Sequence, residues 1–144
     1  MILSLYFLSQ RYWREFAMLQ ISTQGGGVLK NFIIDYFSRP RPAEQLGLGT
    51  TTLPSFPSGH ALGTMICYGF LAYLFVPRMP SRFWKWILSL GMLALVLFEG
   101  LSRIFHGNHY LTDVAAGYAL GIAWVILVCT VIEMVFMRSR RNEE

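Results

Sequence analysis

Hydrophobic residues are concentrated in four runs of this 144-residue chain, and charged residues are grouped between the runs. A helix that crosses the hydrocarbon core of a bilayer needs about 20 mostly apolar residues. Residues 114–132 carry no charge, and residues 83–98 carry only Lys85. Residues 61–76 are uncharged and become long enough if residues 58–60 form the first helical turn. These three runs therefore predict membrane-spanning helices.

The fourth run, residues 16–37, is weaker because it contains three consecutive glycines, two glutamines, Lys30 and Asp35. Polar groups in a span usually face the interior of the bundle, and glycines allow close helix approach in a bilayer. We interpret this run as a span buried among the others, with a re-entrant or broken helix as the alternative. Gly117 and Gly121 on the last span have the spacing of a helix-packing pair.

The pattern as a whole predicts an all-α fold, a polytopic transmembrane helix bundle with about four spans. We expect one membrane-embedded domain over residues 1–144. Composition supports this class, because hydrophobic residues make up 54% of the chain and charged residues 14%, against about 25% charged in a soluble domain. The net charge of +4 is modest, and the arginines stand in short clusters without an aromatic and basic surface. We therefore expect no nucleic-acid partner.

Basic residues between the spans predict the orientation, since cytoplasmic junctions carry an excess of lysine and arginine. With four crossings, three basic clusters fall on one side, which is then cytoplasmic. These clusters comprise Arg11, Arg14, Arg78, Arg82, Lys85, Arg138, Arg140 and Arg141. The two remaining junctions, residues 38–57 and 102–112, share the opposite side. We expect a multi-pass protein of the cell membrane with these two junctions on its extracytoplasmic face.

The two outward junctions and their borders hold most of the reactive side chains. These side chains, which include all three histidines, are Arg39, Arg41, His60, Arg103, His106, His109 and Asp113. Arginines that converge on one point make a receptor for a phosphate group, because the guanidinium fork matches phosphate oxygens. Backbone N–H groups at a helix start also favour an anion, and Gly59 after Ser58 lets the main chain approach closely. The junctions therefore indicate a phosphate site.

The histidines suggest a reaction at that site. A histidine can attack phosphorus if its other ring nitrogen donates to a carboxylate, and His109 and Asp113 lie on one face if that stretch opens the last helix. His60 could protonate the leaving oxygen and later deprotonate a water. Metal binding is the rival interpretation. Zinc sites combine three or four His, Cys or carboxylate ligands, whereas Cys67 and Cys129 lie within the spans. Since nearby arginines would repel a cation, we expect no metal and no other cofactor.

Three short motifs in this chain resemble the signatures of the type-2 phosphatidic acid phosphatase superfamily. The stretch SRIFHGNHYLTD matches the third signature, Ser-Arg, five residues, His, three residues, Asp. PSGH, residues 57–60, matches the second, and FSRPRP, residues 37–42, matches the end of the first. The resemblance covers residues 30–132, and the three motifs stand in the family's order relative to the spans.

The resemblance implies a role for each matched residue. The histidine at the place of His109 forms a phosphohistidine intermediate in this family and is oriented by the residue matching Asp113. His60 would act as general acid and then as general base. The phosphoryl oxygens would be held by a set of donors from all three motifs, namely Arg39, Arg41, Ser58, Gly59 and Arg103. No metal takes part.

The chain departs from the family in two respects. The first signature begins with a lysine six residues before Arg-Pro, and Ile34 occupies that place when one counts from Arg41. Lys30 lies one helical turn earlier and could reach the phosphate from there. The membrane branch of the family usually has six spans, which implies that two N-terminal helices are missing here or are replaced by a partner.

Two ion pairs are also predicted from i,i+4 spacing on a helix. We expect Glu99 to fix Arg103, and Asp35 to pair with Arg39. His106 lies between the matched positions, and we interpret it as a surface or headgroup contact.

The leading hypothesis is an integral-membrane phosphatase that acts on a lipid phosphate or diphosphate, such as isoprenyl diphosphate, phosphatidate or phosphatidylglycerol phosphate. A lipid phosphotransferase would use the same residues. The hypothesis from another class is a non-catalytic lipid-phosphate binder or interaction subunit, prompted by Ile34 and the missing spans. The expected partners are the lipid substrate and the membrane, with a second copy or a helical partner also considered.

Overall fold

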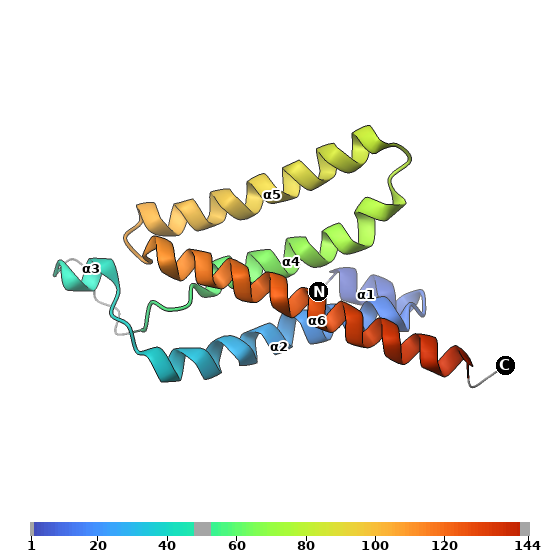
Figure 1. The fold of residues 1–144 in the computed structure, drawn as a ribbon, viewed down its shortest axis with the longest axis horizontal. Helices are drawn as coiled ribbons and strands as arrows, with labels where there is room; N and C mark the ends of the chain where they lie inside the picture. The colour runs from blue at the N-terminus through green and yellow to red at the C-terminus, as the bar shows by residue number, and fades with distance from the viewer. Residues whose placement is uncertain (1, 48–52, 142–144) are drawn as a thin grey trace.

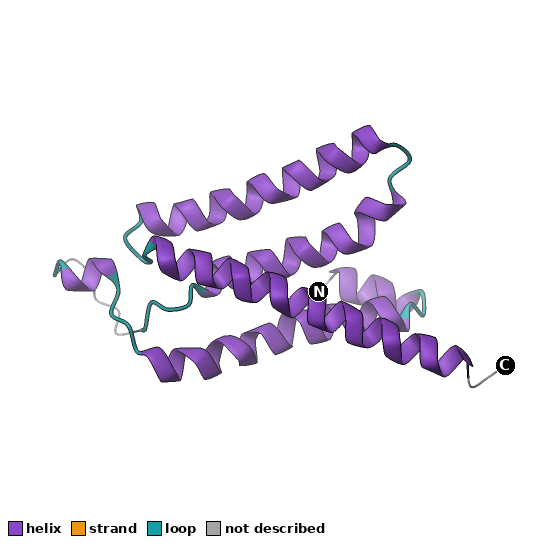
Figure 2. Cartoon of the chain, viewed as in Figure 1, coloured by secondary structure: helices purple, strands orange, loops and turns teal. Residues whose placement is uncertain are grey.

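The computed structural model describes residues 2–47 and 53–141, and within these ranges the regular structure is entirely helical. Figure 1 shows long helices that run back and forth along one axis, and Figure 2 shows that loops are confined to the two ends of the bundle. In chain order the elements are α1 (Ile2–Ser9), α2 (Trp13–Phe37), α3 (Pro42–Gln45), α4 (Gly59–Phe75), the 3₁₀ turn η1 (Val76–Arg78), α5 (Arg82–Phe105) and α6 (Leu111–Arg141).

Three of these helical segments are long and apolar enough to cross a membrane, namely residues 59–78, 82–105 and 111–139. The prediction of an all-α membrane bundle is therefore confirmed. The remaining predicted span corresponds to α2, which is 25 residues long but is not among the segments that reach this apolar character. Its membrane crossing stays a prediction.

The run of three glycines does not break α2, which is one continuous helix from Trp13 to Phe37. The alternative of a re-entrant or broken helix is therefore wrong. The glycines let α6 approach closely instead. A Cβ atom added at Gly25 or Gly26 would contact Trp124 of α6, whose indole N–H donates to the carbonyl oxygen of Ser22 at 3.0 Å. An indole N–H that is buried needs such an acceptor, and the small glycine surface makes room for the ring that carries it.

Gly117 and Gly121 make the same kind of contact between α6 and α4. A Cβ atom at Gly117 would lie 2.7 Å from the carbonyl oxygen of Ser58, and one at Gly121 would lie 2.7 Å from Cβ of Met65. The packing role predicted for this pair is confirmed. Buried apolar side chains from α4 and α6, including Leu62, Ile66, Phe70 and Val128, complete the core beside them.

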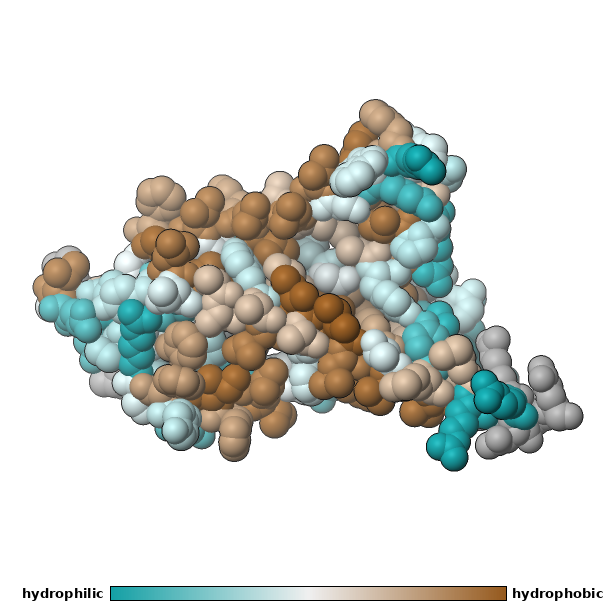
Figure 3. All heavy atoms as spheres, in the orientation of Figure 1, coloured by the Kyte–Doolittle hydropathy of each residue, from teal (hydrophilic) through white to brown (hydrophobic). Residues whose placement is uncertain are grey.

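Apolar side chains remain exposed over much of the bundle. Helix α5 carries many of them, among them Leu90, Leu93, Phe98 and Leu101, and Phe98 is 73% exposed. Figure 3 shows the resulting hydrophobic surface along α5, with hydrophilic residues gathered toward the ends of the molecule. A surface of this kind is suited to contact with lipid chains, because no polar group on it would lose hydrogen bonds to water.

The predicted grouping of the junctions is also observed. Residues 38–47, 53–58 and 106–110 lie at one end of the bundle, and the turn at η1 lies at the other end with the start of α2 and the end of α6 (Figure 1). The two junctions of the first end contact each other directly, since the amide of Ala43 donates to the carbonyl oxygen of Gly107 at 3.1 Å. Gly107 adopts a left-handed φ of +67° in the turn that joins α5 to α6, a conformation that glycine tolerates without strain.

Candidate active site

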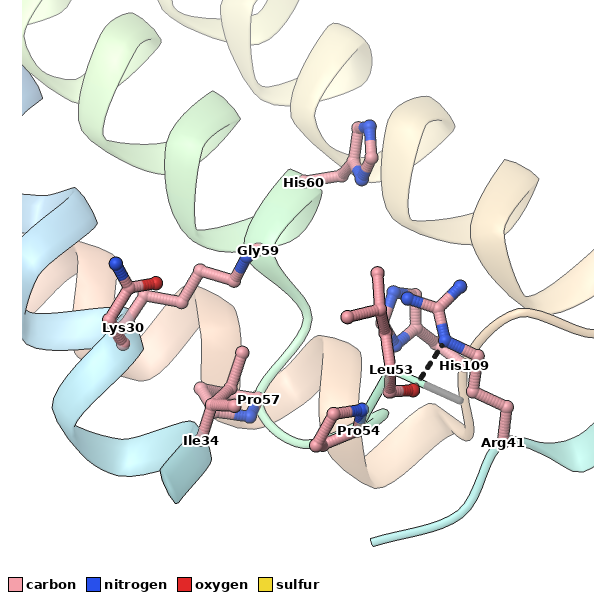
Figure 4. A pocket seen from close by; sticks show the side chains of 10 residues that line it. Lys30, Ile34, Arg41, Leu53, Pro54, Pro57, Gly59, His60 and His109 are labelled. Carbon is pink, nitrogen blue, oxygen red and sulfur yellow. Dashed lines mark hydrogen bonds between the residues drawn. The ribbon is translucent and has the colours of Figure 1, made fainter. Parts of the chain in front are cut away.

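A cavity of about 470 Å³ opens between α2, the start of α4 and the two junctions at this end of the bundle. Figure 4 shows side chains from several elements converging on it. The lining residues are Lys30, Asn31, Ile34, Arg41, Leu53, Pro54, Pro57, Gly59, His60 and His109. Four of the residues predicted as catalytic or phosphate-binding thus border one space with His109, although they lie far apart in the sequence.

His109 is 5% exposed, and its Nδ1 atom lies 2.7 Å from the carbonyl oxygen of Ser55. A carbonyl oxygen can only accept a hydrogen bond, so Nδ1 carries the proton and Nε2 keeps its lone pair. Burial lowers the pKa of His109 from its ordinary value, and Arg41 lowers this pKa further, while the Ser55 bond and Asp113 act in the opposite direction. The ring is therefore favoured in its neutral form, as a nucleophile requires.

Asp113 is fully buried, but it is not the nearest acceptor for His109. The distance from its Oδ2 to His109 Nδ1 is 3.8 Å, which is too long for a hydrogen bond. The carboxylate instead accepts from the amide of Tyr110 at 2.9 Å and from Arg39 at 2.7 Å. Its backbone carbonyl accepts from the amide of Ser58 at 3.0 Å. Asp113 thus holds together the first turn of α6 and the segment before α4.

Arg39 forms an ion pair with the carboxylate of Asp113 and does not line the cavity. The predicted pair of Arg39 with Asp35 is wrong, because α2 ends at Phe37 and Ser38 adopts a left-handed φ of +38°, which takes Arg39 off the helix. Its guanidinium lies 4.0 Å from the ring centroid of Tyr110. The carbonyl oxygen of Arg39 accepts from the amide of Ser55 at 2.7 Å. Arg39 therefore links Asp113 to Ser55, whose own carbonyl oxygen binds His109.

The other arginine of the RPRP motif has a different position. Arg41 lines the cavity, and its Nε donates to the carbonyl oxygen of Leu53 at 3.1 Å. This contact is the dashed line in Figure 4, where the guanidinium of Arg41 lies close to His109. A backbone carbonyl is a neutral partner, so the positive charge of Arg41 remains available to an anion in the cavity.

Lys30 also borders the cavity, one helical turn before Ile34 on the same face of α2. Its side chain extends over the start of α4, where a Cβ atom at Gly59 would lie 2.8 Å from Lys30 Nζ (Figure 4). The lack of a side chain at Gly59 therefore makes room for the ammonium group. Lys30 reaches the site from its earlier position, and Ile34 forms part of the apolar wall.

The start of α4 brings the second motif to the cavity. Ser58 is fully buried and caps the helix, since its Oγ accepts from the amide of Ala61 at 3.4 Å. Serine is a favoured residue at this position, where it satisfies an N–H group that the helix leaves free. Gly59 and His60 line the cavity, and His60 points toward α5 in Figure 4.

Arg103 lies in the last turn of α5 and pairs with Glu99 at 2.7 Å, which confirms the predicted i,i+4 contact. It is absent from the lining of the cavity. His106 is exposed, and its Nδ1 lies 2.7 Å from the carbonyl oxygen of Ser102. His106 therefore stays outside the site, in agreement with its interpretation as a surface residue.

Sequence reasoning missed Ser55, Leu53 and Asn31. The first two act through backbone carbonyl oxygens, which every residue has, so their side chains gave no signal. Asn31 follows Lys30 on α2 and could have been noted from that position alone. Within residues 2–47 and 53–141 no group of three or more His, Cys, Asp or Glu side chains is placed to hold a metal ion.

Apolar helices that can cross a membrane, together with a cavity bordered by two histidines and two cations, define a membrane protein with a candidate phosphate site. Residues 16–137 match the family model of the PAP2 superfamily. The chain belongs to the PAP2 superfamily.

Similar proteins include phosphatidylglycerophosphatase B of Bacillus subtilis, 37% identical over 77 residues, which are 51% of this chain and 37% of that protein. Undecaprenyl-diphosphatase of Sulfolobus acidocaldarius is 33% identical over 98 residues, which are 68% of this chain and 38% of that protein. The crystal structure of a PAP2-type phosphatidylglycerolphosphate phosphatase from Bacillus subtilis superposes with a TM-score of 0.75 at 27% identity, over 90% of this chain and 64% of that one. The chain thus spans little more than a third of these two curated relatives.

Proposed function

We propose that this protein is an integral-membrane phosphatase that hydrolyses a lipid phosphate or diphosphate through a phosphohistidine at His109. The observation that carries the proposal is the state of that ring. Its Nδ1 donates to Ser55, which leaves Nε2 with a lone pair, and it borders a cavity shared with Lys30 and Arg41. A buried, neutral imidazole beside two cations is suited to attack an anionic phosphorus centre.

The reaction has two steps. Nε2 of His109 attacks phosphorus as the bond from phosphorus to the lipid oxygen breaks, and protonated His60 gives its proton to that oxygen. The lipid alcohol leaves, or the lipid monophosphate if the substrate is a diphosphate. Neutral His60 then takes a proton from water, whose oxygen attacks phosphorus while the bond to Nε2 breaks. Inorganic phosphate leaves, and both histidines return to their starting states.

Lys30, Arg41 and the amide of Gly59 would bind the phosphoryl oxygens, since all three border the cavity. Charge-assisted bonds of this kind strengthen as charge develops in the transition state. Arg39 and Ser58 would act at one remove, by holding Asp113 and the start of α4 in place. Arg103, which pairs with Glu99 and does not line the cavity, would likewise act at one remove.

The names of the relatives support the substrate class. Phosphatidylglycerophosphatase B and undecaprenyl-diphosphatase carry a glycerophospholipid phosphate and an isoprenyl diphosphate in their names, and the chain matches 37% and 38% of their lengths. The site would face the extracytoplasmic side, because the opposite end of the bundle carries the basic clusters around Arg11, Arg82 and Arg138. A lipid could then enter from the membrane plane while water enters from outside.

The test is phosphate release by the purified protein from a panel of lipid phosphates and diphosphates, with and without an acceptor lipid. We expect wild type to release inorganic phosphate and His109→Ala to release none. His106→Ala is the matched control, because this histidine is exposed and lies outside the cavity. Binding of the lipids without release by wild type would favour the non-catalytic binder. Transfer to the acceptor in place of release would favour the phosphotransferase.

A further inference from the structure

The two cations that line the active-site cavity reach it from opposite sides. Lys30 extends from α2 over the start of α4, whereas Arg41 and His109 lie together across the cavity (Figure 4). Arg41 acts directly on the nucleophile, because it lowers the pKa of the His109 ring. The cavity therefore has one cation where a phosphoryl group would be attacked and a second cation on the far side.

The position of Lys30 follows from its place on α2. It lies four residues before Ile34, and one helical turn moves a side chain by about 6 Å along the axis. Ile34 lies one turn nearer to the junction that carries Arg41, and with Pro57 it forms an apolar part of the cavity wall. This part of the wall offers no charge to a phosphoryl group beside His109. The cation that α2 contributes is therefore displaced by one turn from that group.

The fold holds the ammonium group of Lys30 at this second position. A Cβ atom added at Gly59 would lie 2.6 Å from Cε and 2.8 Å from Nζ of Lys30, so the lysine side chain lies directly over this glycine. Gly59 is the first residue of α4, and the free N–H groups of a helix start also favour an anion. Lys30 makes no ion pair with any residue that the structure describes. Its charge is available to a ligand in the cavity.

We propose that Lys30 and the start of α4 bind a second phosphate group, so that the preferred substrate is a lipid diphosphate rather than a lipid monophosphate. The inference rests on the proposed function and extends it, because it gives each phosphate its own place in the cavity. The terminal phosphoryl group lies beside His109 and Arg41. The inner phosphate, which carries the lipid, lies beside Lys30. A monophosphate would leave this ammonium group without an anion.

The two side chains suit the two phosphates. The planar fork of Arg41 can hold two oxygens of the group that is transferred, whereas Lys30 acts as a point charge. When the bond from the terminal phosphorus to the bridging oxygen breaks, this oxygen takes the electron pair and the proton of His60, and the lipid monophosphate leaves. Lys30 keeps its own protons and balances the charge on the other oxygens of the leaving group. A cation placed there speeds the departure of a phosphate but not that of an alcohol.

The first test compares initial rates for a diphosphate and a monophosphate that have the same lipid chain. We expect wild type to have the higher kcat/KM for the diphosphate. Lys30→Met should lower both values, and the ratio of diphosphate to monophosphate kcat/KM should fall about tenfold or more, the scale of one charge-assisted hydrogen bond. Lys30→Arg should keep most of the ratio, since it retains the charge. Lys85→Met is the matched control, because the other lysine of the chain lies outside the cavity, and it should change neither rate.

A variant that conserves charge tests whether the position of the lysine matters. Lys30→Met combined with Ile34→Lys moves the ammonium group one turn along α2 toward the junction. We expect the preference for the diphosphate to remain low in this double variant. Full recovery of the ratio would overturn the assignment of a separate place to the inner phosphate. Loss of both rates by the same factor in Lys30→Met, or no change in either, would overturn it as well.

The second test measures binding without turnover. Wild type in detergent is titrated by calorimetry with a non-hydrolysable lipid methylenebisphosphonate and with a lipid phosphonate of the same chain. We expect the bisphosphonate to bind about tenfold more tightly or more, and Lys30→Met to remove most of this difference.

Equal Kd values for the two ligands in wild type would overturn the proposal without recourse to any variant, even if the protein releases phosphate from lipids. The opposite result separates the two claims. If wild type releases no phosphate from any lipid but binds the bisphosphonate more tightly through Lys30, the catalytic function fails and the second phosphate position stands.

Discussion

Charged residues at the two ends of the bundle have different partners. At the end away from the cavity, Arg14 donates to Glu133 at 3.1 Å and to Glu15 at 3.0 Å, and Tyr73 donates to the same Glu133. These contacts join α2, α4 and α6. At the cavity end, Arg39 and Arg103 are paired as well.

Lys30 and Arg41 differ from all of these, since neither makes an ion pair with any residue that the structure describes. A cation whose charge is already neutralised by a carboxylate stabilises the fold, whereas one without a counter-ion can bind an anion. The number of arginines near a site is therefore a poor guide to phosphate binding. The partner of each arginine decides its role.

The comparison is tested most strongly by removing one arginine from each end. Arg41→Ala should lower kcat/KM by about 10²–10³-fold, the usual loss when one preorganised donor to the reacting group is removed. Arg14→Ala should leave kcat/KM unchanged and lower the free energy of unfolding by about 1 kcal/mol, because its partners are partly exposed. Steady-state kinetics and thermal unfolding in detergent measure both. Equal kinetic losses in the two variants would show that the pairing does not distinguish them.

Arg39 provides the next test, because it is an arginine at the cavity end with a structural partner. Arg39→Ala removes the counter-ion of buried Asp113 and loosens the segment that carries Ser55. We expect kcat to fall about 10–100-fold while KM changes little, as for other groups that orient a reacting residue. Arg39→Lys should restore part of kcat, since it keeps the charge. A rise in KM alone would mean that Arg39 binds the phosphate directly.

Glycines on α6 and α5 differ in how closely a neighbouring helix approaches them, and substitutions at these glycines measure the difference. Gly117→Val should lower the free energy of unfolding by about 1–3 kcal/mol, because the new side chain meets the carbonyl oxygen of Ser58 and must displace it. Gly91→Val on α5 meets open space and should have little effect. Thermal unfolding of both variants under one detergent condition makes the comparison. Similar melting temperatures would contradict the close packing of α6 on α4.

The smallest effect concerns pH. Because burial lowers the pKa of His109, its neutral form should persist below the usual histidine value of about 6.5. We expect the acid limb of kcat/KM to fall at a lower pH than that value, with activity lost as His109 becomes protonated. Phosphate and thiophosphate substrates, whose own pKa values differ, separate the enzyme's limb from the substrate's. An enzyme limb above the ordinary histidine value would contradict the burial argument.

The sequence was sufficient to predict the helices and the gathering of several candidate site residues at one end of the bundle. Hydrophobic runs predicted the long helices because their apolar stretches match the length of a span, and the spacing of Gly117 and Gly121 predicted a close contact. The grouping of His60 and His109 at one end followed from the number of crossings. Lys30 was predicted to reach the site from one turn before Ile34, and the helical periodicity of α2 places both on one face.

Other features depended on how the junctions turn. The RPRP motif contains two equivalent arginines, and only the left-handed Ser38 and the path after it decide that Arg39 meets Asp113 while Arg41 meets the cavity. The contact of His109 with Ser55 uses a backbone carbonyl, which no side-chain pattern can indicate. A sequence motif thus locates a site, but the path of the backbone decides which residue of the motif contacts which partner.

The central claim is that His109 becomes phosphorylated during turnover. Rapid acid-free quenching of wild type with a radiolabelled lipid phosphate, followed by digestion and mass spectrometry, tests it most directly. With a substrate whose leaving group needs no proton, His60→Ala slows only the attack by water and should raise the amount of trapped intermediate. We predict an acid-labile phosphoryl group on the peptide that contains His109. Continued phosphate release with no phosphoryl group on that peptide, or with the group on another residue, would contradict the account.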